Sequence, residues 1–171
     1  MKQIQHEPLG WDDVNRLIDV LIPQFDVEFE GMVIITRGGV IPGGLLAEAL
    51  EQTHILTAAV DFPAEMERDA TKLYAWPEFI QFPSDEMLTG RRLLVVDDVW
   101  GSGRTITTVR NRVEAVGSTP YTCVLHFNPN RNLFGTARPD YYGAVTDKHV
   151  IYPWEINRGP DRILSSPLGV G

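Results

Sequence analysis

The chain has 171 residues, enough for one domain with a substantial core, and its 43% hydrophobic content excludes a disordered chain. A formal net charge of −8 argues against a broad nucleic-acid-binding face, and no apolar run approaches the length of a membrane span. The one cysteine, Cys123, excludes an intrachain disulfide, and with no signal-peptide pattern at the N-terminus we expect a cytoplasmic protein.

The predicted elements alternate between helix and strand along the chain. The first helix starts near Trp11, where Asp12 can cap it, and Pro23 either ends or bends it because proline disrupts a helix. Buried strands are predicted at residues 32–36, 55–60, 93–97, 121–127 and 150–152, and further helices at 42–50 and 104–116. This order predicts a single α/β domain over residues 1–171, with a mostly parallel central sheet flanked by helices.

Residues 61–92 interrupt this alternation with mixed charge, three prolines and no clean period. Long irregular segments in compact domains are usually functional lids or disordered, so we expect a flexible lid that can include a short edge hairpin. Arg68 and Lys72 could reach a bound phosphate from this lid, although solvated surface charge is the simpler interpretation. The tail, residues 157–171, is rich in Gly, Pro and Ser and is expected to be loosely ordered.

The most informative segment is residues 93–105, LLVVDDVWGSGRT, which predicts a strand that ends on two acids and turns through glycines into a helix. Glycines let the backbone N–H groups point inward, and the helix N-terminus adds partial positive charge, which suits a phosphate. Asp97 and Asp98 suit sugar hydroxyls or a magnesium ion. The segment therefore predicts a site for a phosphorylated ribose, with an ordinary strand–turn–helix as the alternative.

This segment resembles the phosphoribosyl-pyrophosphate (PRPP) signature of the type I phosphoribosyltransferase family. A P-loop would need a Lys in the turn, and a dinucleotide fingerprint would need a third Gly where Ile106 stands. The resemblance implies that Asp97 and Asp98 bind the ribose hydroxyls, directly or through Mg²⁺. It also implies that five residues hold the 5′-phosphate, namely Gly101, Ser102, Gly103, Arg104 and Thr105.

A second glycine turn follows the strand at 32–36 and resembles the pyrophosphate loop of the 6-oxopurine phosphoribosyltransferases. Gly38 and Gly39 permit a tight turn, and Arg37 supplies a fixed positive charge with bidentate reach to phosphate oxygens. The resemblance implies that Arg37 acts in catalysis together with Asp97 and Asp98, by taking charge that develops on departing pyrophosphate.

Residues 138–156 resemble the C-terminal hood of the xanthine-guanine and hypoxanthine-guanine phosphoribosyltransferases. In that hood an aromatic residue stacks on the purine and the next backbone groups bond the edge of the base. By position these places fall to His149 and Val150, while Glu155 takes the place of an acid that helps to hold Mg²⁺ with Asp98. A half-buried histidine and a solvated carboxylate are the alternatives for His149 and Glu155.

Two positions on the base side depart further from the 6-oxopurine pattern. Gly101 stands where an acid usually bonds the purine N7, and Asn128 stands where a Lys usually reads the 6-oxo group. An asparagine amide can donate to an oxo group or accept from an amino group, so the accepted base is left open.

The resemblance implies a PRPP-dependent purine phosphoribosyltransferase, a pentosyltransferase of purine salvage that uses Mg²⁺ and releases pyrophosphate. Its expected partners are PRPP and a purine base, with no nucleic acid and no membrane. Relatives commonly pair, which leaves a homodimer or a higher homo-oligomer open. Because the base side is altered, a non-catalytic regulatory protein that binds PRPP or a nucleotide on the same fold is the alternative.

Overall fold

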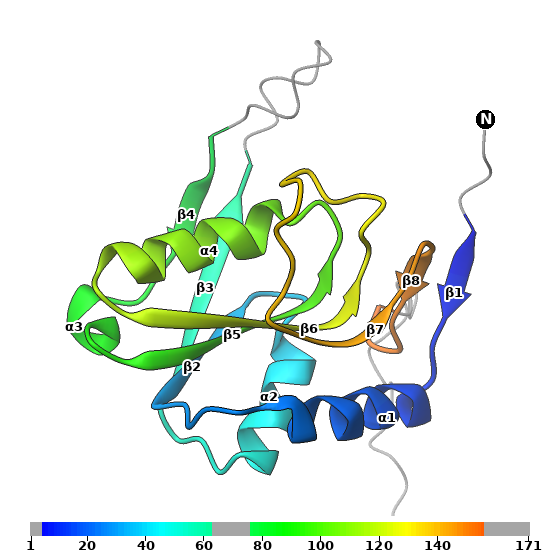
Figure 1. The fold of residues 1–171 in the computed structure, drawn as a ribbon, viewed down its shortest axis with the longest axis horizontal. Helices are drawn as coiled ribbons and strands as arrows, with labels where there is room; N and C mark the ends of the chain where they lie inside the picture. Colours follow the sequence, from blue (N-terminus) through cyan, green and yellow to red (C-terminus); the bar gives the residue numbers. More distant parts are fainter. Residues whose placement is uncertain (1–4, 63–75, 156–171) are drawn as a thin grey trace, which may run out of the picture.

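The computed structural model describes residues 5–62 and 76–155. Within them, the central sheet has the strand order β4-β3-β2-β5-β6-β7, and neighbours run parallel except at the β3–β4 edge (Figure 1). The strands of this sheet are β2 (Gly31–Ile35), β3 (Ile55–Asp61), β4 (Glu78–Gln81), β5 (Arg92–Trp100), β6 (Thr119–Phe127) and β7 (Tyr141–Val145). The predicted α/β fold with a mostly parallel sheet is confirmed.

Helices cover both faces of the sheet, which explains why its inner strands read as apolar runs. The helices are α1 (Trp11–Leu21), α2 (Val40–Ala49), α3 (Asp85–Leu88) and α4 (Arg104–Ala115). Leu94 and Val96 of β5 pack in one cluster with α1 and α2, while Leu93 and Val95 pack on the opposite face with α3 and α4 (Figure 1). The two faces of β5 therefore hold the two halves of the core together.

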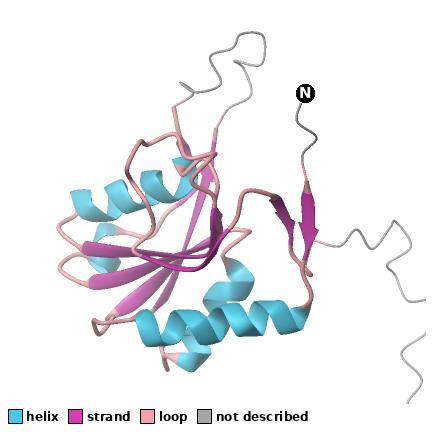
Figure 2. Cartoon of the chain, turned by 45° about the vertical axis from the view of Figure 1, so that its right-hand side comes forward, coloured by secondary structure: helices cyan, strands magenta, loops and turns pink. Residues whose placement is uncertain are grey.

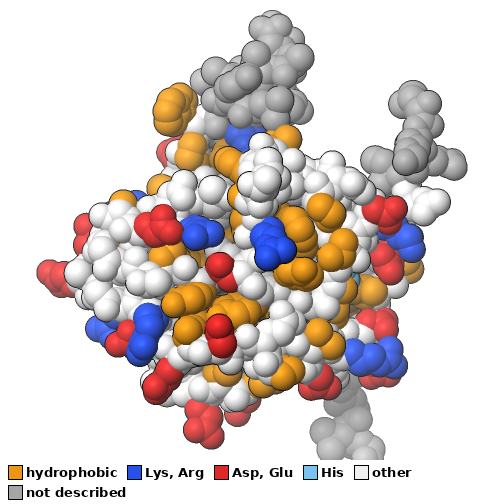
Figure 3. Space-filling model, in the orientation of Figure 1, with side chains coloured by type: hydrophobic (Ala, Val, Ile, Leu, Met, Phe, Trp, Pro, Cys, Tyr) orange, Lys and Arg blue, Asp and Glu red, His pale blue; other side chains and the backbone are white. Residues whose placement is uncertain are grey.

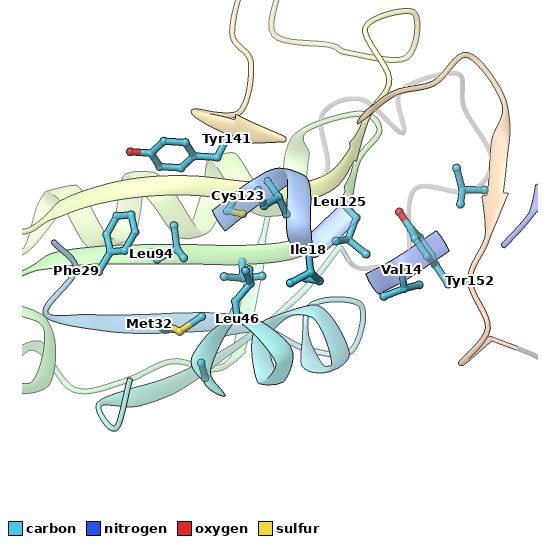
Figure 4. Packing of buried hydrophobic residues seen from close by; sticks show 14 residues of the cluster. Val14, Ile18, Phe29, Met32, Leu46, Leu94, Cys123, Leu125, Tyr141 and Tyr152 are labelled. Carbon is cyan, nitrogen blue, oxygen red and sulfur yellow. The ribbon is translucent and has the colours of Figure 1, made fainter. Parts of the chain in front are cut away.

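The core under α1 and α2 draws on four adjacent strands of the central sheet, the outermost being β7 with Tyr141 (Figure 4). It includes Met32 from β2, Leu94 from β5, and both Cys123 and Leu125 from β6. Cys123 is fully buried, and burial raises the pKa of its thiol, so this cysteine is held as an unreactive core residue.

The first helix begins and ends close to the predicted positions, but its cap differs. The N-cap is Gly10, whose N–H donates to the Asp13 carboxylate at 2.9 Å. The predicted cap at Asp12 is wrong because the acid at the third helical position reaches back to the chain entering the helix. The α-helix ends at Leu21, and a single 3₁₀ turn (Ile22–Gln24) that contains Pro23 follows, as predicted.

Strand β5 continues past the acid pair, so the predicted end at Asp97 is wrong. Its pairing with β2 stops at Val96, whereas its pairing with β6 extends to Trp100. The partner on one side keeps the backbone extended even though the side chains have become polar. Asp97 and Asp98 therefore lie where β5 has lost its neighbour β2 but keeps β6.

A second, small sheet lies apart from the central one (Figure 2). Strand β1 (His6–Pro8) pairs in parallel with β8 (His149–Ile151), and neither belongs to the six-stranded sheet. The strand predicted at 150–152 is present as β8 but lies outside the central sheet, because its partner is the N-terminal segment. Strand β7, which was not predicted, takes the edge position beside β6 instead.

The described parts of 61–92 contain the expected edge hairpin. Strand β4 pairs antiparallel with the end of β3, with Asp61 opposite Glu78. Arg68, Lys72 and the tail at 157–171 lie outside the described residues, and the role of 61–92 as a lid stays a prediction.

The surface is mixed in character. Acidic, basic and hydrophobic side chains lie side by side on the face in Figure 3, an ordinary surface pattern. Among the helices in the described ranges, none combines the length and apolarity that crossing a membrane requires.

Candidate functional site

The predicted site residues gather at the carboxyl ends of the parallel strands, where open α/β sheets bind ligands. The 37–39 turn follows β2, the acid pair lies in the last part of β5, and Asn128 directly follows β6. The topology thus brings three segments, separated by up to 91 positions along the chain (from 37 to 128), to one edge of the sheet (Figure 1).

The 37–39 turn lies directly against the acid pair. A Cβ atom at Gly38 would lie 2.6 Å from the carboxylate of Asp98, and one at Gly39 would overlap the carbonyl oxygen of Val96. The peptide bond between Thr36 and Arg37 is cis, and the Arg37 side chain is exposed. Glycine is therefore required at 38 and 39 by close approach of β5, and the Asp98 carboxylate borders the turn predicted to bind pyrophosphate.

The acid pair is half-buried and carries negative charge without a cationic partner. The N–H of Asp98 donates to the carboxylate of Asp97 at 3.0 Å, and among the described residues no ion pair includes either side chain. Burial, with the charge of Asp98 added, raises the pKa of Asp97 well above its usual range. Burial also raises the pKa of Asp98 to about 6, and the charge of Glu155 adds to this shift. Such a pair favours a cation or hydroxyl donors.

The raised pKa of Asp98 predicts how the stability of the fold depends on pH. The pKa of Asp98 is about 6 when folded and near 3.8 ordinarily, so between these values the folded state holds a proton that the unfolded state releases. Stability therefore falls as the pH rises through this window. We expect Asp98→Asn to raise the free energy of unfolding at pH 7.5 by on the order of 2 kcal/mol and to leave it nearly unchanged at pH 3.5.

Urea unfolding of both proteins in a chelating buffer, at several pH values, measures this difference. If the difference in free energy of unfolding between the two proteins stayed constant from pH 3.5 to 7.5, this would contradict the claim that the charge of Asp98 destabilises the fold.

The turn after β5 is shaped by one glycine and one tryptophan. Gly103 has φ +79°, and a Cβ atom there would overlap the indole Nε1 of Trp100. That indole is itself fixed, because its N–H donates to the Asn132 side chain at 3.2 Å. Helix α4 begins at Arg104, and no side chain of its N-cap residue closes its N-terminus. The result is a rigid turn that leads into a helix N-terminus suited to an anion.

The other residues of the turn differ in their surroundings. The Ser102 hydroxyl accepts from the N–H of Arg104 at 3.4 Å, and the Arg104 guanidinium lies over the Phe62 ring at 4.1 Å from its centroid. A Cβ atom at Gly101 would meet nothing within 4 Å, so the position has room for a larger side chain. Thr105 is half-buried in the first turn of α4.

The hood residues contact both the N-terminal strand β1 and one another. His149 is exposed at the start of β8 and meets His6 edge-on, with ring centroids 5.2 Å apart, while Val150 is buried. The carboxylate of Glu155 accepts from the N–H of Tyr152 at 2.8 Å. Glu155 lies near enough to Asp98 for its charge to raise the pKa of that acid.

Asn128 is only 2% exposed, and its amide is used within the protein. Its oxygen accepts from the N–H of Asn130 at 3.1 Å, and its nitrogen donates to the carbonyl of Lys148 at 3.5 Å. The side chain thus ties the end of β6 to the loop before β8.

Two aromatic residues behind the acid pair, His126 and Tyr152, were not identified from the sequence. The Tyr152 hydroxyl donates to the carbonyl of Asp98 at 2.9 Å and meets the Nδ1 atom of His126 at 2.9 Å. No local pattern could have indicated these contacts, because their partners lie on separate strands.

Comparisons with known proteins point to one family and one fold. The family model described as "Phosphoribosyl transferase domain" matches residues 1–154. A xanthine-guanine phosphoribosyltransferase of Roseobacter denitrificans is 27% identical over 160 residues, covering 86% of this chain and 84% of the relative. One of Gluconobacter oxydans is 26% identical over 162 residues, covering 89% and 86% respectively. The crystal structure of a purine phosphoribosyltransferase from Pyrococcus horikoshii superposes with a TM-score of 0.75 at 25% identity, covering 89% of this chain and 95% of that one.

Proposed function

Because this chain belongs to the phosphoribosyltransferase family, we propose that it transfers the 5-phosphoribosyl group of PRPP to a free purine base and releases pyrophosphate. The observation that carries the proposal is the contact between the Asp98 carboxylate and the Gly38 turn, beside the rigid turn at Gly103. These features offer adjacent places for the ribose, the pyrophosphate and the 5′-phosphate of one ligand. The names of the curated relatives support a purine as the acceptor and, with it, a role in purine salvage.

The 5′-phosphate would bind in the turn at 101–105. Backbone N–H groups at the start of α4 and the hydroxyls of Ser102 and Thr105 are donors suited to its oxygens. Gly103 has the left-handed conformation, which suits a turn whose backbone N–H groups bind an anion. The Arg104 guanidinium, over Phe62, connects the turn to the beginning of the predicted lid.

The acid pair would bind the ribose. Burial raises the pKa values of Asp97 and Asp98 because it disfavours their charged forms. Hydrogen bonds from the ribose hydroxyls would stabilise those charged forms. In the transition state the C1 carbon of the ribose becomes cation-like, and two adjacent negative charges near the sugar favour that charge.

A magnesium ion fits the chemistry of Asp98 and Glu155, since both offer hard carboxylate oxygens and neither forms an ion pair with any described residue. Among the described residues no group of three or more His, Cys, Asp or Glu side chains gathers as a metal site, so the remaining ligands would be oxygens of PRPP and water. When bound, Mg²⁺ would offset negative charge on the pyrophosphate.

The leaving group would be held at the 37–39 turn. The bond between C1 and the pyrophosphate oxygen breaks, its electron pair leaves with pyrophosphate, and a ring nitrogen of the base forms the new bond to C1. Arg37 and the backbone N–H groups of the glycine turn would stabilise the charge that grows on the departing oxygens.

The base would lie under the hood, between the acid pair and β8. His149 would stack on the purine, and the backbone at Val150 would bond its edge. In the structure the Asn128 amide is engaged by Asn130 and Lys148, so reading a base with Asn128 would require the exchange of at least one of those bonds.

The same engagement of Asn128, together with the glycine at 101, favours a second candidate function. A regulator would keep the PRPP turn and bind PRPP or a nucleotide without turnover. The loss of the groups that recognise the base would not impair such a function.

A pyrophosphate-release assay separates the two functions. Purified protein is incubated with PRPP, Mg²⁺ and one base at a time: hypoxanthine, guanine, xanthine, adenine, orotate or uracil. We expect base-dependent release with at least one purine and none with the pyrimidines, because the relatives that this chain resembles are named for purine bases. Binding of PRPP without release from any base would contradict transfer and support the regulator.

A further inference from the structure

We propose that Tyr152 is a positioning residue that sets the base-binding hood against the acid pair, an inference that rests on the proposed function. Its side chain is 1% exposed, and its hydroxyl donates to the carbonyl of Asp98 at 2.9 Å. Asp98 lies on β5, whereas Tyr152 directly follows β8 of the separate small sheet. A single hydroxyl therefore connects the segment that carries His149 to the strand that carries the acids.

The contact with His126 fixes the direction of this hydrogen bond. A carbonyl only accepts, so the one hydroxyl proton goes to Asp98 and the hydroxyl oxygen accepts a proton from Nδ1 of His126, 2.9 Å away. His126 is 5% exposed, and burial lowers its pKa, so the ring is neutral with its proton on Nδ1. The chain His126–Tyr152–Asp98 thus has one arrangement of protons and crosses three elements: β6, the hood and β5.

The backbone and the ring of Tyr152 also contact the residues that follow it in the hood. Its N–H donates to the carboxylate of Glu155 at 2.8 Å. Its ring stacks on Trp154 with centroids 4.6 Å apart and planes 4° apart, and Trp154 in turn meets Trp11 of α1. Figure 4 shows the Tyr152 ring beside Val14 of the same helix. Tyr152 therefore contacts the backbone of one proposed metal ligand and the side chain of the other.

This arrangement matters because strand pairing attaches only part of the hood to the central sheet: β7 pairs with β6, whereas β8, which carries His149, does not pair with that sheet. In the described ranges β8 has a ladder only with β1, and the six-stranded sheet has no strand in common with that pair. The position of His149 relative to the ribose site therefore depends on the short loop from β7 and on side-chain contacts, of which the Tyr152 hydroxyl reaches the backbone of Asp98 itself.

The variant Tyr152→Phe tests the proposal because it keeps the ring and its stacking and removes the hydroxyl. Calorimetry measures the Kd of two ligands in the presence of Mg²⁺: guanosine monophosphate, which has a base, and ribose 5-phosphate, which has none. We expect the Kd of the nucleotide to rise about tenfold and that of the sugar phosphate to change less than about twofold.

The matched control is Tyr141→Phe. This variant also loses a hydroxyl bond, the partly buried one of 2.6 Å from Tyr141 to Asp26, but the bond joins β7 to the segment before β2 and does not involve β8 or the acid pair. If Tyr152 had only a structural role, both variants would lower the melting temperature, and neither would change the Kd of the nucleotide more than the Kd of the sugar phosphate. That result would overturn the proposal. A wild-type protein that binds ribose 5-phosphate but no purine nucleotide would instead contradict the proposed function.

Discussion

Replacing both Asp97 and Asp98 with Asn is expected to abolish PRPP binding while the fold survives. Each carboxylate would lose charge-assisted hydrogen bonds of about 1.5–3 kcal/mol to the ribose hydroxyls or to Mg²⁺, so the affinity should fall on the order of 10³-fold or more. The fold should gain stability near neutral pH, because burial disfavours both charges. Titration calorimetry with PRPP and Mg²⁺ measures the first effect, and urea unfolding measures the second.

The chain supplies a matched control in a second pair of neighbouring acids. Asp12 and Asp13 lie in the first turn of α1, and their replacement with Asn changes the net charge by the same amount. That control should bind PRPP as the wild type does. Unchanged PRPP affinity in the Asp97→Asn, Asp98→Asn protein would remove the basis for the ribose site.

The variant Gly103→Ala is expected to have the second largest effect. The methyl group would overlap the Trp100 indole, and the backbone would be held at φ +79°, where a side chain costs about 1–2 kcal/mol. Because Trp100 is buried and bonded to Asn132, the turn must move rather than the tryptophan. Displaced N–H donors should weaken PRPP binding by on the order of 100-fold, as measured by the same titration.

The variant Gly117→Ala separates the effect of the positive φ from the effect of the overlap with Trp100. Gly117 has a similar φ of +82°, but a Cβ atom there meets nothing within 4 Å. This control should lose about 1 kcal/mol of stability and keep its PRPP affinity. Equal affinities in the two variants would show that the shape of the turn at Gly103 does not matter for the ligand.

The parts of the fold that were predictable are those with a local signal. The buried run from Leu93 to Val96, the glycine turn and the apolar period of α4 each follow from neighbouring residues, and together they located the phosphate turn. The spacing of Gly38 and Gly39 after β2 likewise located the second turn, which the structure places against Asp98.

The parts that could not be predicted depend on partners far away in the chain. Strand β5 continues to Trp100 only because β6 runs beside it, which no feature of residues 97–100 reveals. Strand β1 has three residues, His6–Pro8, with no apolar alternation, and it exists as a strand because β8 pairs with it. The bond from Tyr152 to Asp98 spans 54 positions and was invisible for the same reason.

The central claim is that the acid pair and the glycine turn hold one phosphorylated sugar, and a crystal structure with PRPP and Mg²⁺ tests it most directly. The account predicts the 5′-phosphate within the turn at 101–105, the ribose hydroxyls within hydrogen-bond distance of Asp97 or Asp98, and the pyrophosphate against Gly38 and Gly39. Ordered PRPP bound elsewhere on the protein, with that turn empty and the two aspartates directed away from the ligand, would contradict it.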